Sequence, residues 1–270
     1  EHAIKSAADF AAVAWLFDQA AVHPNYEGLE RLREEIGDRG LIVATANMGA
    51  SAMHHILHEL MPYDLFFCAY YDHHEELVGL AERMTPYVER VIDCAIASPA
   101  EIVQSGTNYD VQITWPPFFE KHLLPSLVKT ASRCHAAGKF LLNHTDGENR
   151  GLLPLYLKAG IDIADAVCPA PMTSLTLGEI REAFAGRITI WGGIPSVAVL
   201  ENSMTDAEFE AYLDDLFLQM GRGDHLILSI ADTAPPGMKF SRLERIAKTA
   251  RAFGPVTPCG TEQEGVKERT

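Results

Sequence analysis

The chain has 270 residues, of which 47% are hydrophobic, and a formal net charge of −15. This length and apolar content suffice for the buried core of one large domain or two small ones. The acidic balance disfavours a nucleic-acid backbone or an anionic membrane as a partner, because both attract positive charge. No run approaches the ~20 apolar residues that span a bilayer, and the first residues lack the pattern of a signal peptide. We therefore expect no membrane association and a cytoplasmic protein.

Short apolar runs rich in valine, isoleucine and leucine alternate with longer segments of helical period. This alternation is typical of βαβ units and indicates a parallel α/β sheet. The predicted strands are 41–46, 102–106, 139–143, 162–167, 188–192 and 225–230. No linker or internal repeat interrupts the pattern, so we predict a single domain over 1–256, followed by a polar tail over 257–270.

Several helix ends are readable from the sequence. Thr176 with Glu179, and Thr205 with Glu208, have the spacing of capping boxes. The last helix is predicted over 239–252, with an apolar stripe that faces the core. That stripe is Phe240, Leu243, Ile246, Ala247 and Ala250.

A long helical segment, 51–97, separates the first two strands and is rich in histidine and aromatic residues. His54 and His58 are one helical turn apart, a spacing that metal ligands also use. The HExxH motif is absent, however, because Glu59 follows His58 rather than His54. We therefore predict a partly exposed helical face at His54, His55 and His58 rather than a metal site.

Polar residues gather where the strand 139–143 ends, with His144, Asp146 and Glu148 in sequence. In parallel α/β proteins the ligand lies at the carboxyl ends of the strands, so these residues are candidates for chemistry. The alternative is a helix N-cap, with Asp146 accepting backbone N–H groups. Similar junctions follow other strands, with Asn47 and Met48, with Asn108, Tyr109 and Asp110, with Cys168, and with Asp232.

Cys168 allows three interpretations. It could be a soft metal ligand, a thiol nucleophile with His144 as its base, or a buried core residue. The five cysteines of the chain form no CxxC pair, which argues against a disulfide framework or a structural zinc knuckle.

The run over 106–162 combines an acidic strand end, a helix entered as PxxFxxxxLPxL, the pattern HxxGK before a strand, a histidine at the tip of that strand and LxxGID. The later segments ITIWGGIPS and GDHLILSIADTAPPG continue the pattern. Together they resemble the uroporphyrinogen decarboxylase superfamily, which includes the methylcobamide:coenzyme M methyltransferases. The resemblance covers about residues 40–253 and implies a TIM (β/α)8 barrel whose first strand lies before Glu1.

For the site, the resemblance implies catalysis by His144, Asp146 and Asp110. Zinc or another divalent metal would be held by His144, Asp146 and Asp232, with Cys168 as a further ligand. Asp146 and Asp232 stand where the methyltransferases have cysteines, and such a ligand set is harder than the usual one. The residues expected to bind substrate are Asn47, Met48, Asn108, Tyr109, Glu148 and Trp191.

These observations favour a methyltransferase or demethylase that acts on a small methylated substrate, with a corrinoid supplied by a partner protein. The sequence is also compatible with a homodimer. The first alternative is a metal-free decarboxylase, in which Asp110 or Asp146 stabilises charge beside the reacting carbon. A porphyrinogen is disfavoured as substrate, because Arg150 is the only arginine near a proposed active-site loop. The second alternative is a non-catalytic barrel that binds a ligand.

Overall fold

The computed structural model describes residues 2–46 and 48–256 and divides into two compact units, Glu1–Asp165 and Ala166–Thr270. The division falls after Asp165, inside a strand. The single domain that the sequence predicts over 1–256 stays a prediction. Asn47 and the predicted tail over 257–270 lie outside the described residues.

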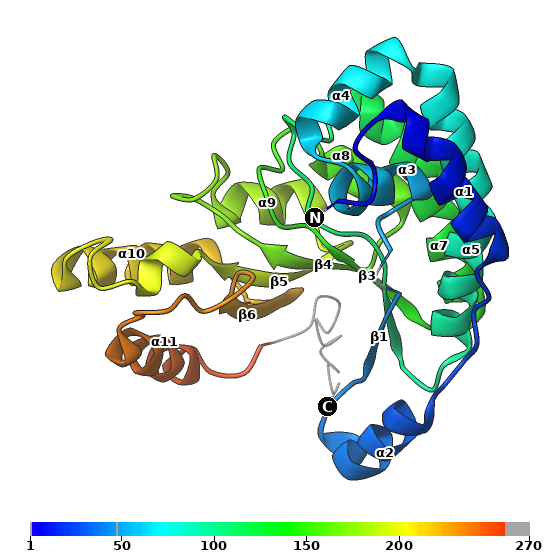
Figure 1. Cartoon of the computed structure of the whole chain (residues 1–270). Helices are drawn as coiled ribbons and strands as arrows, with labels where there is room; N and C mark the ends of the chain where they lie inside the picture. The colour runs from blue at the N-terminus through cyan, green and yellow to red at the C-terminus, as the bar shows by residue number, and fades with distance from the viewer. Residues whose placement is uncertain (1, 47, 257–270) are drawn as a thin grey trace, which may run out of the picture. The chain divides into compact units, whose positions relative to one another are not determined.

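The first unit is a layer of parallel strands packed with helices (Figure 1). Its elements are η1 (Ala7–Asp9), α1 (Phe10–Gln19), α2 (Glu27–Ile36), η2 (Gly37–Arg39), β1 (Val43–Thr45), α3 (Ala52–His55), η3 (Ile56–Leu60), α4 (Tyr63–Asp72), α5 (His74–Ala97), β2 (Ile102–Gln104), α6 (Pro116–Phe118), η4 (Phe119–Leu123), α7 (Leu124–Ala136), β3 (Phe140–His144), α8 (Leu153–Ala159) and most of β4 (Ile163–Val167). Both η3 and η4 are single π-helical turns.

The second unit continues from the end of β4. Its elements are α9 (Leu177–Phe184), β5 (Thr189–Ile194), η5 (Ser196–Val199), α10 (Asp206–Gln219), β6 (Leu226–Ile230) and α11 (Phe240–Phe253). Its helices α9 and α10 pack together, and the backbone N–H of Gly178 donates to Gln219 Oε1 at 3.1 Å.

All six predicted strands are present, and the strand pairs run parallel, β1 with β2, β2 with β3, β3 with β4, and β5 with β6. The predicted α/β class with parallel strands is therefore confirmed. The described residues contain six strands, whereas a closed (β/α)8 barrel has eight. Within the first unit the parallel register brings the carboxyl ends of β1, β2 and β3 to one edge.

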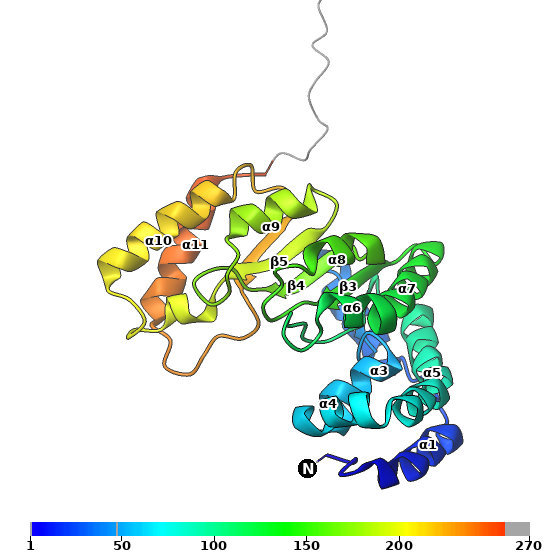
Figure 2. The same ribbon diagram turned by 90° about the horizontal axis from the view of Figure 1, so that it is seen from above.

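The core of the first unit depends on the amphipathic face of α5. Leu77, Leu80, Met84, Val88 and Ile92 recur at helical spacing, and all are buried. This face packs on α1 and reaches β1, and Figure 2 shows α1 alongside α5. Burial of each such side chain stabilises the fold by roughly 1.5–3 kcal/mol.

In the second unit both predicted capping boxes are confirmed, with Thr176 Oγ1 and Thr205 Oγ1 each accepting a backbone N–H at 3.2 Å. The predicted apolar stripe of α11 is wrong in part. Ile246 is buried, but Phe240 is 64% exposed and the charged Arg242 is buried instead. Arginine is usually exposed, so the sequence pattern alone predicts a surface position for Arg242. The backbone carbonyl groups that accept its hydrogen bonds become apparent only in the structure.

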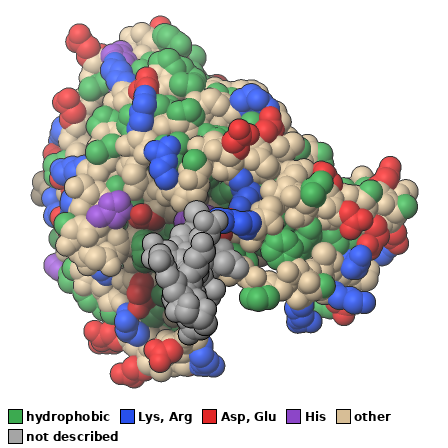
Figure 3. Space-filling model, turned by 180° about the vertical axis from the view of Figure 1, so that it is seen from behind, with side chains coloured by type: hydrophobic (Ala, Val, Ile, Leu, Met, Phe, Trp, Pro, Cys, Tyr) green, Lys and Arg blue, Asp and Glu red, His purple; other side chains and the backbone are tan. Residues whose placement is uncertain are grey.

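None of the helices in the described part of the chain combines the length and the apolar character needed to cross a membrane. On the face drawn in Figure 3, acidic side chains are interspersed with basic ones.

Candidate functional site

A cavity of about 150 Å³ opens in the first unit where β1, β2 and β3 end. The strands contribute polar side chains, the loops that follow β1 and β2 contribute backbone and small residues, and the α3–η3 segment covers one side. The lining residues are Thr45, Met48, Gly49, His55, Glu59, Gln104, Gly106, Thr107, Asn108 and His144. The cavity therefore lies at the edge where parallel α/β proteins place their ligands.

His144 ends β3 and is held by a carboxylate on the neighbouring strand. It lies opposite Asp165 in the parallel register, and its Nδ1 is 2.9 Å from Asp165 Oδ2. The two side chains keep 20% and 25% of their surface exposed, so the pair is largely removed from solvent. Because a carboxylate only accepts, Nδ1 carries the proton in this bond. Asp165 thus fixes the tautomer and orientation of a histidine that lines the cavity.

The loops after β2 and β3 are joined beside this histidine. The backbone N–H of Tyr109 donates to Asp146 O, and that of Val111 donates to Glu148 O, each at 2.9 Å. Asp110 reinforces the junction, because its carboxylate accepts the backbone N–H groups of Gln112 at 2.8 Å and Glu148 at 3.2 Å. In this structure the Asp110 carboxylate therefore holds the two loops together through hydrogen bonds to their backbone.

Asn108 connects the cavity lining to the second loop. Its Nδ2 donates to Asp146 Oδ2 at 3.3 Å, which places the Asp146 carboxylate behind a cavity residue. Glu148 binds locally, since its Oε1 accepts the backbone N–H of Arg150 at 2.9 Å.

Tyr109 is buried behind the cavity and is not one of its lining residues. Its side chain has no exposed surface and stacks on His54, with ring centroids 5.1 Å apart and an interplanar angle of 12°. Gly106 has a φ of +94°, and a Cβ there would lie 2.3 Å from Tyr109 Oη and 2.7 Å from Asn143 Oδ1. Only glycine fits this turn between the buried phenol and the cavity.

The histidine-rich segment agrees in part with its predicted partly exposed face, because His55 and His58 are partly exposed. His54 is fully buried, and its Nδ1 accepts the backbone N–H of Ala50 at 3.0 Å, so the neutral ring carries its proton on Nε2. His58 packs edge-on against His54 and its Nδ1 is 3.0 Å from Tyr63 Oη. The Nε2 atoms of both rings are buried and make no hydrogen bond with the described residues.

Burial lowers the pKa values of these histidines. The pKa of His54 lies well below 6.5 because burial removes the ring from water, and His58 nearby lowers it further. Burial also lowers the pKa values of His55 and His58, although the Glu59 carboxylate raises both in part. The imidazole that this segment contributes to the cavity lining, that of His55, is therefore neutral near pH 7.

The structure brings together part of the predicted set. Met48, Asn108 and His144 line one cavity, and Asp146 is bonded to Asn108. Trp191, Cys168 and Asp232 belong to the second unit, so the predicted roles that join them to His144 stay predictions. Cys168 is buried within that unit, as core packing requires.

No group of three or more histidine, cysteine, aspartate or glutamate side chains is placed to hold a metal ion within residues 2–46 and 48–256. His144 has the carboxylate partner that many metal-binding histidines have. A complete ligand set does not surround it in the described structure, so we derive no step through zinc.

Sequence reasoning missed five residues of this site. Most of the candidates that the sequence indicates follow the predicted strands. Asp165, Thr45 and Gln104 lie within strands instead. A charged residue within the apolar run DIADAV was the available signal for Asp165. His55 ends α3 and Glu59 lies in the π-turn of η3, a turn that the sequence does not reveal.

No family model and no curated protein matches this chain. Solved structures do match it. A methyltransferase from Methanosarcina mazei has a similar fold. The TM-score is 0.63 with 14% sequence identity, and the match covers 84% of this chain and 63% of that one. The chain thus spans less than two thirds of that structure, and at this identity the likeness is one of fold.

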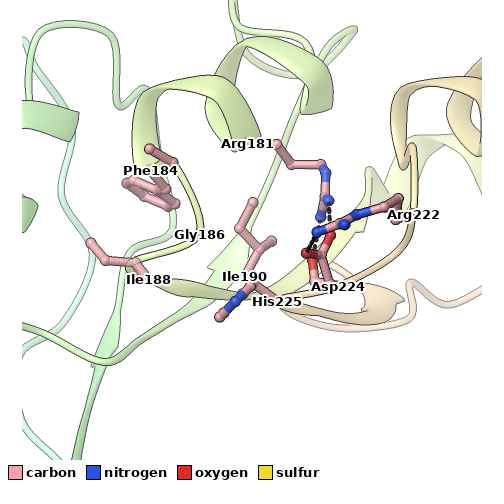
Figure 4. Close-up of a pocket in the computed structure, with 9 residues that line it drawn as sticks. Arg181, Phe184, Gly186, Ile188, Ile190, Arg222, Asp224 and His225 are labelled. Carbon is pink, nitrogen blue, oxygen red and sulfur yellow. Dashed lines mark hydrogen bonds and ion pairs between the residues drawn. The ribbon is translucent and has the colours of Figure 1, made fainter. Parts of the chain in front are cut away.

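The second unit has a cavity of about 260 Å³ of its own, at the amino ends of β5 and β6 (Figure 4). Arg181 and Arg222 both point at Asp224 there. Arg181 donates to Asp224 O at 2.8 Å and to Oδ1 at 3.1 Å, while Arg222 donates to Oδ2 at 2.7 Å. Arg222, and then Arg181, hold the pKa of the Asp224 carboxyl below its usual range. The Asp224 carboxylate thus pairs with both guanidinium groups at the strand end associated with stability, so we assign these residues a structural role.

The buried histidines predict a loss of stability in mild acid. The pKa of a histidine is ~6.5 in an unfolded chain. Folded values are lower for His54, His55 and His58, and burial lowers that of His122 to about 4. Below pH ~6.5 the unfolded state binds more protons, so the free energy of unfolding falls by up to about 1.4 kcal/mol per pH unit for the fully buried His54, and by less for the partly exposed histidines, which solvent screens.

Urea unfolding at several values between pH 7.5 and pH 5 measures this slope, above the range in which most carboxylates titrate. His122→Gln removes one contributing group, and the slope should become shallower. The exposed His23→Gln is the matched control and should leave the slope unchanged. A free energy of unfolding that is constant over this range would contradict the assignment.

Proposed function

We propose that this chain is a uroporphyrinogen decarboxylase-like enzyme that transfers a methyl group between a small methylated compound and a corrinoid carried by a partner protein. The observation that carries the proposal is the His144–Asp165 pair at a small cavity on the carboxyl edge of the strands. The fold shared with a methyltransferase and the sequence resemblance support the same reaction class.

The pair provides acid and base chemistry at one nitrogen. With its proton on Nδ1 and bonded to Asp165, neutral His144 offers the lone pair of Nε2 as a base. When Nε2 is protonated, the Asp165 carboxylate stabilises the imidazolium, and His144 becomes an acid. Methyl loss breaks the bond between the methyl carbon and its heteroatom, and the electron pair stays on the heteroatom. His144 then supplies the proton that this atom takes up.

The surrounding residues position the substrate. Asn108 presents its side chain to the cavity and is bonded to Asp146, and Thr45 Oγ1 donates to Gln104 Oε1 at 2.9 Å. Because these polar side chains are hydrogen-bonded to one another, their donor and acceptor groups have fixed orientations in the cavity lining. Such preorganisation lowers the cost of orienting a small substrate.

The test combines the purified chain with reduced cobalamin and a panel of methyl ethers, methyl thioethers and methylated amines under anaerobic conditions. Formation of methylated cobalamin, followed by its absorbance, is expected with at least one class of substrate. The exposed His23→Asn variant should retain this activity. Release of CO₂ from small carboxylates without any corrinoid would instead establish a decarboxylase. Binding without turnover of any compound would establish a ligand-binding protein.

A further inference from the structure

The charges around the cavity of the first unit are unbalanced. Its lining residues include one carboxylate, Glu59, and neither lysine nor arginine. Two histidines also line it, and His55 is kept neutral near pH 7 because burial lowers its pKa. The charged side chain of the lining is therefore negative.

Glu59 has no charged partner within the first unit's cavity. Its carboxylate makes no hydrogen bond or ion pair with the described residues, and only its backbone carbonyl is engaged, 3.4 Å from His2 Nδ1. Its field nevertheless reaches the histidines and Tyr63. Burial lowers the pKa values of His55 and His58 and Glu59 opposes that lowering in part, while burial and then Glu59 raise the pKa of Tyr63. The carboxylate thus creates a negative potential on the side of the cavity that η3 covers.

We infer that this cavity binds a small methylated ammonium ion, with Glu59 as its counter-ion. The inference rests on the proposed function and names its substrate class. A carboxylate substrate would meet the Glu59 carboxylate with no lysine or arginine in the lining beside it, and two negative charges at short range repel. An ammonium ion would complete the pair, and the cavity of about 150 Å³ suits a molecule of a few heavy atoms.

The same charge suits the reaction. When a methyl group leaves an ammonium nitrogen for a nucleophilic acceptor such as a reduced corrinoid, the C–N bond breaks and the electron pair stays on nitrogen. The product is a neutral amine, whose lone pair then takes the proton of the His144 imidazolium. Glu59 binds the cationic substrate, and His144 handles the proton of the product.

The test compares three probes of similar shape and different charge, namely tetramethylammonium, tert-butanol and pivalate. Binding to the whole chain is measured by titration calorimetry and by ligand-observed NMR. Tetramethylammonium should bind most tightly, and its affinity should fall as salt rises, because salt screens an ion pair. Tighter binding of pivalate, or equal binding of all three probes, would overturn the inference.

Glu59→Gln removes the charge and keeps the shape of the side chain. It should weaken tetramethylammonium binding about tenfold, which equals ~1.4 kcal/mol, and leave tert-butanol binding unchanged. Glu75→Gln is the matched control, because Glu75 is exposed on α5 and does not line the cavity. Unchanged affinity in Glu59→Gln would refute Glu59 as the counter-ion.

Failure of this inference is distinguishable from failure of the proposed function, since binding requires no turnover. Methyl transfer that depends on His144 but not on Glu59 would leave the function standing and reject the ammonium substrate. Glu59-dependent binding of the cation without turnover of any methylated compound would leave the cation site standing and reject the proposed methyl transfer.

Discussion

His144→Asn is expected to lower turnover by about 10²–10⁴-fold, the range that a positioned acid or base contributes. Asparagine retains a polar side chain at the end of β3 but cannot exchange a proton near neutral pH. The fold should persist, because His144 is partly exposed and lies at the last residue of its strand. Initial-rate measurements with the active substrate give the loss in kcat, and thermal unfolding gives the change in stability.

Asp165→Asn separates orientation from acid–base chemistry. The amide can donate a hydrogen bond to Nδ1, which moves the proton of the neutral ring to Nε2 and reverses the roles of the two nitrogens. We expect kcat to fall with little change in KM, because Asp165 acts through His144 rather than on the substrate. Wild-type kcat in both variants would reject the pair as the acid–base group. A loss confined to KM would make His144 a binding residue.

The strand pattern of this protein could be predicted from its sequence because buried parallel strands are short, apolar and rich in branched residues. The six runs of valine, isoleucine and leucine stand out from the helical segments, and each became a strand. The same pattern placed His144 at a strand end, next to the cavity. Local sequence suffices here, since the carboxyl edge of a parallel sheet is defined by strand direction alone.

The remainder of the site depends on contacts between distant residues. Asp165 was missed because its partner is 21 residues away and is set by strand register. Tyr109 follows β2 as a substrate residue would, but the positive φ of Gly106 turns the chain so that the phenol is buried. Asp110 looks like a catalytic carboxylate in the sequence, whereas the structure shows its oxygens accepting two backbone N–H groups.

The histidine-rich segment shows how periodicity misleads at short range. Histidines at i and i+4 share a helical face, and three polar residues on one face predict exposure. The segment instead contains a π-turn over η3, and His54 stacks on a buried tyrosine that follows another strand. Neither the turn nor the stacking partner is visible in the sequence of the segment itself.

Arg242→Met is expected to destabilise the second unit by about 3–5 kcal/mol, since several buried carbonyl groups would lose their donor together. The side chain is 3% exposed and its guanidinium lies over the Phe209 ring, 4.9 Å from the ring centroid. Its guanidinium donates at 3.1 Å to Ala198 O, at 2.5 Å to Leu200 O, at 2.6 Å to Met204 O and at 3.2 Å to Asp206 Oδ1.

Methionine fills a similar volume and keeps the apolar stem, so the variant tests the hydrogen bonds rather than a cavity. Replacement of a buried charge by an apolar residue is tolerated where both partners are replaced. The partners of Arg242 cannot be replaced in this way, because three of the four groups that accept its hydrogen bonds are backbone carbonyls. Arg251→Met is the matched control on the same helix, exposed to solvent, and should change stability by less than ~0.5 kcal/mol. Amide hydrogen exchange should accelerate over residues 197–209 in Arg242→Met alone, and unchanged exchange there would show that the arginine does not hold this segment.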